Sequence, residues 1–238
     1  VADMAAPTGG CELGTLLGGG IARVELLRGS NSVVWGSDAI GGVLAVTSAE
    51  ADGAAASVEY GANDSLVADA RAGVKRDGYA LTLNGGYARS DGISAFAGGS
   101  EPDGFHQWHL GGRARLQLAD DWALVGAGRY ADSRVDFDGY PAPAYAFADT
   151  PEYQTTRQAS GRAGFEYHGA VLLRGGLALS STRRAYFDPT WGPAANYETQ
   201  GRSLRADLAG RADLAEGLTL DFGADSEWTR FSTSYDAA

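Results

Sequence analysis

Apolar and polar side chains alternate in runs of roughly ten residues along most of the chain after residue 53. In the run 65–76, small and aliphatic side chains occupy the even positions from Leu66 to Val74, and Asp69, Arg71 and Lys75 occupy odd positions. A period of two predicts β-strands with one apolar face and one charged face. About nine such runs follow one another, which predicts an all-β fold.

The breaks between these runs are alternately short and long. Short turns of two residues stand at 77–78, 120–121, 168–169 and 216–217, and longer polar segments stand near 91–105 and 187–197. Short turns at one end and long loops at the other are typical of outer-membrane β-barrels. The mean hydropathy is −0.20, and no window reaches the ~18 apolar residues of a membrane helix. A soluble β-sandwich is the alternative, but the charge-rich faces give no sign of a covering sheet.

Composition excludes several classes of function. The formal net charge of −11 argues against nucleic-acid binding, which needs clustered Lys and Arg. Cys11 is the single cysteine, so no intramolecular disulfide forms, and we interpret it as a small structural residue rather than a reactive thiol. The histidines, His106, His109 and His168, have no evident Ser–Asp partners. We therefore expect a protein that is not an enzyme.

The segment 21–47, IARVELLRGSNSVVWGSDAIGGVLAVT, differs from the alternating runs. Glycine-rich turns join its short apolar runs. The stretch VELLRGSNSVVWGSDAIGGVLAVTS resembles the C-terminal part of the plug domain of TonB-dependent outer-membrane receptors. In that family a VEVLRGP-type strand, an aromatic residue with Gly and an [ST]-x-A-x-GG-V-I step lead into the barrel. Two positions differ from the family pattern: Ser30 stands where the family usually has Pro, and residues 45–47, Ala-Val-Thr, stand where the family usually has an Ile-rich ending. A glycine-rich loop between two strands is the simpler alternative.

The resemblance implies two parts, with residues 1–48 as the C-terminal part of a plug and 49–238 as N-terminal strands of a transmembrane antiparallel β-barrel. A barrel that encloses a plug needs about 22 strands, so a sheet of about nine cannot close. Its open edges would leave backbone groups unpaired in hydrocarbon. The sequence starts at Val1 without the basic and apolar regions of a signal peptide, so either this peptide was removed or the chain begins inside a larger protein. The plug resemblance favours the second, and we expect a fragment of a larger receptor from the outer membrane of a Gram-negative bacterium. Residues 13–17, before three glycines, predict a short helical turn.

The best detailed resemblance is to vitamin B12 (cobalamin) transporters, through the segment 130–150. It implies that Asp138 and Asp149 match two carboxylates of a calcium-binding loop. The sequence EPDGF at 101–105 is similar to an earlier ligand loop, and another expected acid aligns near Ser94. The implied calcium ligands are Glu101, Asp103, Asp136, Asp138 and Asp149. Calcium prefers such hard oxygen ligands, and solvated loop carboxylates are the alternative.

The mechanism that the resemblance implies is energised uptake across the outer membrane. A TonB–ExbB–ExbD complex would pull on the plug through a segment that precedes Val1. Cobalamin is the expected cargo, and a ferric siderophore is the alternative. The loop aromatics expected to contact the cargo are Tyr140, Tyr145, Phe147 and Tyr153, with mobile surface aromatics as the alternative. Glu25 and Arg28 are expected to dock the plug onto barrel charges such as Arg113 or Asp69, or else to face solvent.

Overall fold

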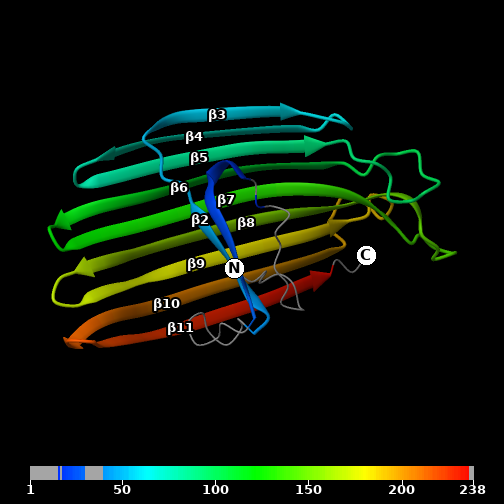
Figure 1. Cartoon of the computed structure of the whole chain (residues 1–238). Helices are drawn as coiled ribbons and strands as arrows, with labels where there is room; N and C mark the ends of the chain where they lie inside the picture. Colours follow the sequence, from blue (N-terminus) through cyan, green and yellow to red (C-terminus); the bar gives the residue numbers. More distant parts are fainter. Residues whose placement is uncertain (1–15, 17, 30–39, 236–238) are drawn as a thin grey trace.

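The computed structural model describes residues 16, 18–29 and 40–235. Its main element is an antiparallel sheet of nine strands, in which each strand pairs with its neighbours in sequence (Figure 1). The strands are β3 (Gly53–Tyr60), β4 (Leu66–Arg76), β5 (Tyr79–Ser90), β6 (Phe105–Ala119), β7 (Trp122–Gly139), β8 (Ala148–His168), β9 (Leu172–Phe187), β10 (Tyr197–Ala215) and β11 (Leu218–Tyr235). The predicted all-β fold with about nine barrel strands is confirmed.

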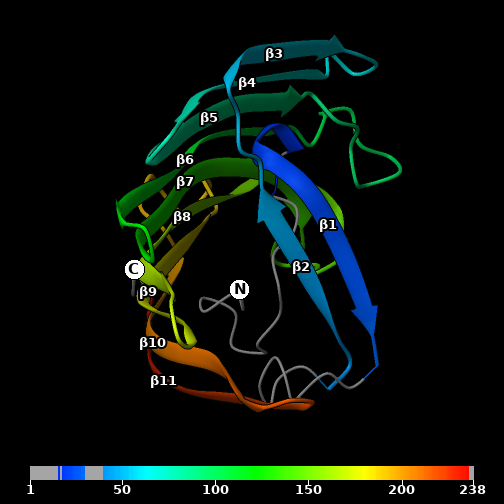
Figure 2. The same ribbon diagram turned by 60° about the vertical axis from the view of Figure 1, so that its left-hand side comes forward.

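The sheet is curved, and a separate two-stranded hairpin crosses its concave side (Figure 2). The hairpin consists of β1 (Ile21–Arg28) and β2 (Gly42–Ser48). A 3-10 turn, η1 (Gly18–Gly20), precedes it. Of the predicted helical turn at 13–17, only residue 16 belongs to the described part of the chain, and Cys11 lies outside it.

The side of the sheet that faces the hairpin is identified by one close approach. A Cβ atom added to Gly20 of η1 would lie 2.6 Å from the side-chain oxygen of Asn84 in β5. Asn84 therefore points into the concave side, and its cross-strand partners Arg71 and Gly111 share that face. Residues of the opposite parity, such as Leu83, point outward.

The two faces differ in chemistry as the alternation predicts. Ion pairs cross the inner face from strand to strand and include Arg115–Glu166, Arg162–Asp207 and Arg205–Asp225. The outer face carries a band of exposed apolar side chains, among them Leu110, Leu179 and Trp228 at 59%, 62% and 58% exposure. Among the described residues, no helix is long and apolar enough to cross a membrane.

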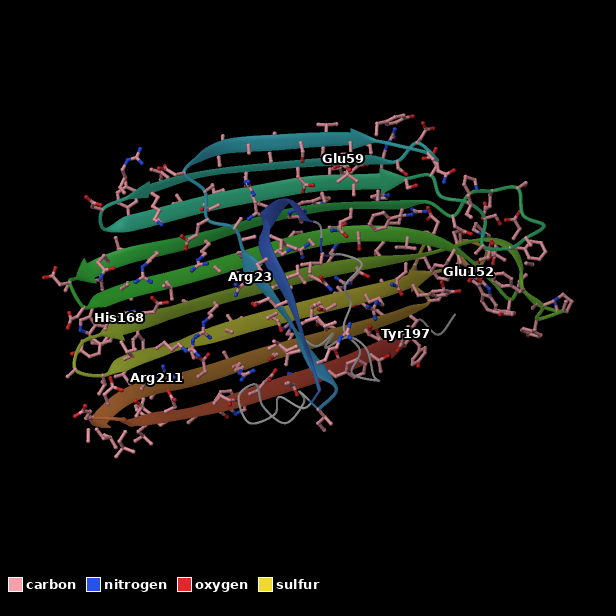
Figure 3. The ribbon with its side chains drawn as sticks, viewed as in Figure 1. Arg23, Glu59, Glu152, His168, Tyr197 and Arg211 are labelled. Carbon is pink, nitrogen blue, oxygen red and sulfur yellow. The ribbon has the colours of Figure 1, made fainter. Side chains whose placement is uncertain are left out.

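The two ends of the sheet also differ. Turns of two or three residues join the strands at one end, and the long segments between β5 and β6, β7 and β8, and β9 and β10 lie at the other (Figure 1). Figure 3 places His168 and Arg211 near the short turns and Glu152 and Tyr197 near the long segments. We call these the turn end and the loop end. The expected division of the chain at 48/49 falls between the two sheets, since β2 ends at Ser48 and β3 begins at Gly53.

Candidate functional site

Three carboxylates lie close together at the loop end, one from the β5–β6 loop and two from the residues that flank the β7–β8 loop. One oxygen from each of Glu101, Asp138 and Asp149 lies within 4.8 Å of the others. Glu101 comes from the β5–β6 loop, Asp138 from the end of β7, and Asp149 from the start of β8. Asp138 is buried, with 7% exposure, whereas Glu101 and Asp149 are exposed. The antiparallel pairing of β7 with β8 brings the two aspartates to the same end of the sheet.

Asp138 organises the surrounding backbone through its hydrogen bonds. Its Oδ2 accepts a hydrogen bond from the Phe96 N–H at 2.7 Å, and its Oδ1 accepts one from the Thr150 N–H at 3.0 Å. The Ser94 hydroxyl lies 3.3 Å from Oδ2. Asp149 makes a similar link, since its Oδ2 accepts a hydrogen bond from the Ser100 N–H at 3.0 Å. The two aspartates therefore tie the β5–β6 loop to the β7–β8 connection.

The carboxyl groups of this cluster ionise differently. Burial raises the pKa of Asp138, but the N–H groups of Thr150 and Phe96 and the Ser94 hydroxyl outweigh it and hold the pKa below its ordinary value. Desolvation, followed by the negative charges of Asp149 and Asp138, raises the pKa of Glu101. Asp138 therefore keeps its charge to lower pH than an ordinary aspartate, and Glu101 takes up a proton at higher pH than an ordinary glutamate.

The other two expected ligands lie beside this group and outside it. Burial is the main cause that raises the pKa of Asp103, and its Oδ2 accepts a hydrogen bond from the Ala95 N–H. Its Oδ1 is buried and has no hydrogen-bond partner within the described ranges. Asp136 is held by Arg134, whose Nε lies 2.8 Å from Asp136 Oδ1. The structure thus brings three of the five residues together.

These residues fit a calcium ion by their chemistry. Calcium takes six to eight oxygen ligands at about 2.3–2.6 Å, so ligands on opposite sides of one ion are about 5 Å apart. The 4.8 Å span of the three carboxylates is compatible with that shell. The buried oxygen of Asp103 is a further acceptor beside it. Ser94, where the resemblance expects another acid, contributes a hydroxyl that contacts Asp138.

The expected cargo-contacting aromatics occupy two different places. Phe147 lies between Tyr140 and Phe96, with ring centroids 5.3 and 5.9 Å away, and therefore links the two acidic loops. Tyr145 is 72% exposed. Tyr153 lies on the outer face of β8, where its ring stacks on Phe187 at 4.6 Å. The β7–β8 loop thus carries three of the four aromatics, and Tyr153 packs on the outside of the sheet.

A row of inward aromatic residues at the loop end was missed by the sequence analysis. Phe105, Tyr186, Tyr197 and Tyr235 occupy one cross-strand row on the same face as Asn84. The Tyr197 and Tyr235 rings lie 4.8 Å apart. The parity of each strand was the signal for this row, because every second residue from a known inward position also points inward.

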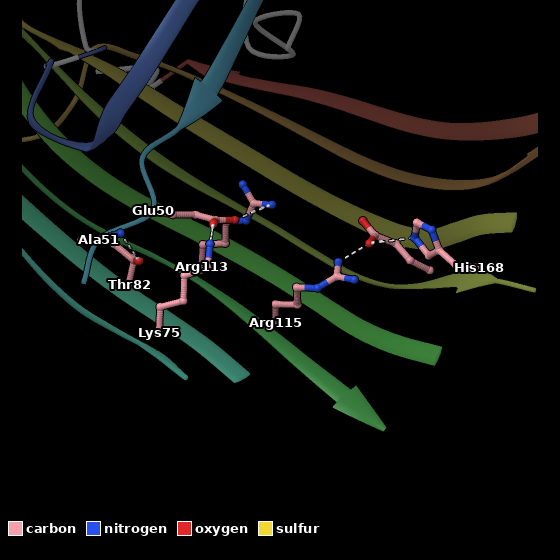
Figure 4. Close-up of polar contacts among 8 residues, drawn as sticks. Glu50, Ala51, Lys75, Thr82, Arg113, Arg115 and His168 are labelled. Atoms are coloured by element: carbon pink, nitrogen blue, oxygen red, sulfur yellow. Dashed lines mark hydrogen bonds and ion pairs between the residues drawn. The ribbon is translucent and has the colours of Figure 1, made fainter. Parts of the chain in front are cut away.

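The hairpin is tied to the sheet through the linker 49–52 rather than through Glu25. Glu25 pairs with its neighbour Arg23 at 2.7 Å, and Arg28 has no ion pair with a residue in the described segments. Arg113, one of the two expected docking partners, instead pairs with Glu50 at 3.2 Å. Figure 4 shows Glu50 reaching this guanidinium from the linker.

Further contacts hold the same linker. Lys75 Nζ lies 3.8 Å from Glu50, and Arg76 pairs with Asp52 at 3.2 Å. The Ala51 N–H donates to the Thr82 hydroxyl at 3.0 Å, and Thr82 is 3% exposed (Figure 4). Solvent-exposed ion pairs contribute little, so the buried Thr82 hydrogen bond is the firmest part of this attachment.

Replacing Thr82 with valine should loosen the linker. Valine keeps the shape but removes the acceptor for the Ala51 N–H, and an unpaired buried donor costs about 1–3 kcal/mol. Hydrogen exchange at Ala51 should then accelerate roughly 5- to 150-fold. Thr229→Val, on the exposed strand β11, is the matched control and should leave this exchange unchanged. Equal exchange rates at Ala51 in both variants would show that the hydroxyl does not hold the linker.

Comparison with known proteins shows the fold. No protein-family model matches the chain. The ferric preacinetobactin receptor BauA from Acinetobacter baumannii matches with a TM-score of 0.54 at 12% identity, over 91% of this chain and 48% of that one. The copper transporter OprC and the ferric yersiniabactin uptake receptor FyuA from Yersinia pestis each match with a TM-score of 0.43, at 13% and 16% identity. They cover 90% of this chain, and 48% and 49% of their own.

The chain thus spans about half the length of the solved structures that it matches. Its curved sheet has the fold of part of a TonB-dependent receptor barrel. The similarity at 12% identity extends to the fold and no further.

Proposed function

We propose that this chain is the plug-to-barrel part of an outer-membrane receptor that takes up a scarce nutrient with energy delivered through TonB. The observation that supports it best is the β1–β2 hairpin, which crosses the concave side of the barrel sheet and is tied to that sheet by its linker (Figure 2). A hairpin in this position obstructs the lumen. Uptake then requires a force that moves it.

The outer face supports placement in a membrane. In β11 the outward side chains from Leu218 to Trp228 include Leu220 and Phe222, and a membrane-spanning strand needs about 9–11 residues. The inner face carries the ion pairs instead. A barrel wall with lipid outside and a polar lumen inside has this distribution.

The two candidate cargoes have different support. The cluster of Glu101, Asp138 and Asp149 supports cobalamin, because it lies at positions where the sequence resembles the calcium loops of cobalamin transporters. The inward row that contains Tyr186 and Tyr197 supports a ferric siderophore, since it presents aromatic rings and phenolic hydroxyls at the mouth of the lumen. The name of the matched ferric preacinetobactin receptor supports the second cargo as well.

The deciding experiment uses the full-length parent receptor in detergent. Binding of cyanocobalamin and of ferric siderophores, preacinetobactin included, is measured by intrinsic fluorescence with and without calcium. Calcium-dependent cobalamin binding would select the first cargo, and siderophore binding with no cobalamin binding would select the second. Binding of neither, together with a receptor that is absent from purified outer membranes, would contradict the proposed function.

Calcium binding by the acidic loops should weaken in acid. Calcium binds ionised carboxylates. Because the pKa values of Glu101 and Asp103 are raised, protons compete with calcium for these two carboxylates at higher pH than for ordinary Glu and Asp side chains. The lowered pKa of Asp138 keeps that carboxylate charged across the same interval. We expect affinity to fall about two- to tenfold from pH 7.5 to pH 5, as measured by calorimetry. Glu101→Gln should bind more weakly at pH 7.5 and depend less on pH, and an unchanged pH dependence would contradict this assignment.

A further inference from the structure

An aspartate and a histidine meet on the inner wall of the sheet, on the turn-end side of the row of inward aromatic residues. Asp69 in β4, Gly86 in β5 and His109 in β6 lie in register with one another, on the face that Asn84 identifies as inward. Each of these three strands has a neighbouring strand on both sides. The arrangement therefore belongs to the interior of the sheet and not to either of its edges.

The absence of a side chain at Gly86 lets the two groups approach each other. A Cβ atom added to Gly86 would lie 2.6 Å from Cε1 of His109 and would overlap Oδ1 of Asp69. The imidazole and the carboxylate thus share the space that a side chain on the middle strand would fill. Any larger residue at this position would have to displace one of them.

Both groups present a buried polar atom that has no partner. Oδ1 of Asp69 and Nδ1 of His109 make no hydrogen bond within the described ranges, and His109 is only 4% exposed. Buried polar atoms are normally hydrogen-bonded or bound to a ligand, because leaving them unpaired is destabilising. A ligand that binds both atoms at once would remove this cost.

The chemistry of the two atoms points to a metal ion. A neutral imidazole nitrogen and a carboxylate oxygen are typical ligands of Zn²⁺ and its neighbours in the first transition row, at about 2.0–2.2 Å. Two protein ligands leave the remaining positions of the ion for water or for groups of a cargo. Asp69 also borders a cavity between η1 and strands β3 and β4, which provides room for them.

We propose that Asp69 and His109 bind a late first-row divalent metal ion such as Zn²⁺ on the inner wall of the barrel. The site is separate from the acidic loops, whose clustered ligands are oxygens and suit calcium. One charge opposes the ion, since Arg129 lies in the adjoining inward row, opposite Gly111, and the negative charge of Asp69 offsets it. The proposal goes beyond the proposed function, because it requires the inner wall and no particular cargo.

The test uses the untagged full-length receptor in detergent, after metals have been removed with a chelator. Zinc is titrated by calorimetry in excess calcium, which competes for the acidic loops, and the absorption spectrum of Co²⁺ reports the ligands of the bound ion. Asp69→Asn and His109→Gln should each weaken zinc binding at least about tenfold. His106→Gln, which alters an exposed residue of opposite parity on the same strand, is the matched control and should bind zinc as the parent does.

Gly86→Ala tests the geometry without removing a ligand. The added methyl group fills the space between the carboxylate and the imidazole, so zinc binding should weaken here as well. If this variant does not fold, Asp69→Asn, which keeps the shape of the side chain, provides the comparison.

Three results would overturn the proposal. The first is a parent receptor that binds no zinc, and the second is equal zinc affinity in the parent and in the Asp69 and His109 variants. Either result would leave only water between the two side chains. The third is loss of zinc binding in His106→Gln alone, which would move the site to the outer face. Cargo binding measured on the same samples tests the proposed function separately.

Discussion

Replacing Asp138 with alanine should abolish tight calcium binding by the acidic loops. The substitution removes the buried member of the carboxylate cluster and leaves the N–H groups of Phe96 and Thr150 without their acceptor. Removing a residue that only supports the ligands of a metal lowers metal affinity roughly 10- to 100-fold. Removing the Asp138 carboxylate, which is itself expected to bind calcium, should therefore lower calcium affinity by more than about 100-fold. Calorimetric titration of the full-length receptor with calcium measures the effect.

Asp136→Ala is the informative control for this experiment. The sequence resemblance gives Asp136 and Asp138 the same role, whereas the structure pairs Asp136 with Arg134 and leaves it outside the cluster. We expect the Asp136 variant to bind calcium within about threefold of the parent, because its pair with Arg134 is partly exposed and worth little. Equal losses in the two variants would contradict the cluster that the structure defines.

Gly92→Ala should produce the second large effect, by displacing the β5–β6 loop. Gly92 has φ of +73°, a left-handed conformation that costs other residues about 1–2 kcal/mol. An added Cβ would also overlap the carbonyl oxygen of Asp103. The start of the β5–β6 loop at Gly92 must therefore move away from Asp103 near its end. Glu101 lies between these two residues and would move with the loop. We expect at least about tenfold weaker calcium binding and faster proteolysis within 93–103.

Gly192→Ala separates the two causes of this effect. Gly192 in the β9–β10 loop also has positive φ, +131°, but a Cβ there would meet no atom within 4 Å. The control variant therefore shares the backbone strain without the collision and should leave calcium affinity unchanged. Normal calcium affinity and normal proteolysis in the Gly92 variant would show that the β5–β6 loop adapts to the side chain.

Arg113, which the sequence analysis named as a docking partner, pairs with an acid that the analysis did not name. Arg113 was expected to receive a charge from the plug segment, and the charge comes from Glu50, two residues beyond β2. The sequence contains several acids near this point. The choice among them depends on where the linker passes over β4 and β5, which is set by the hydrogen bond between Ala51 and Thr82.

The sequence by itself determined the strands and their two faces. Alternation has a period of two in any β-strand, so parity alone separated Asp69 from Leu66. The turn-forming residues Asp77-Gly78 and Glu216-Gly217 located two of the turns. The acidic loop residues were named through the resemblance to cobalamin transporters, which rests on two stretches of the sequence, 101–105 and 130–150.

Only the tertiary structure decided which of those residues meet. Asp138 and Asp149 are near in sequence, but Glu101 joins them because β6 and β7 return the chain to the same end of the sheet. Asp136 is excluded because it lies beside Arg134 on the outer face. Asp69 and His109 meet only through the register of β4, β5 and β6. Such contacts depend on strand register and loop path, which many distant interactions set together, so no local pattern encodes them.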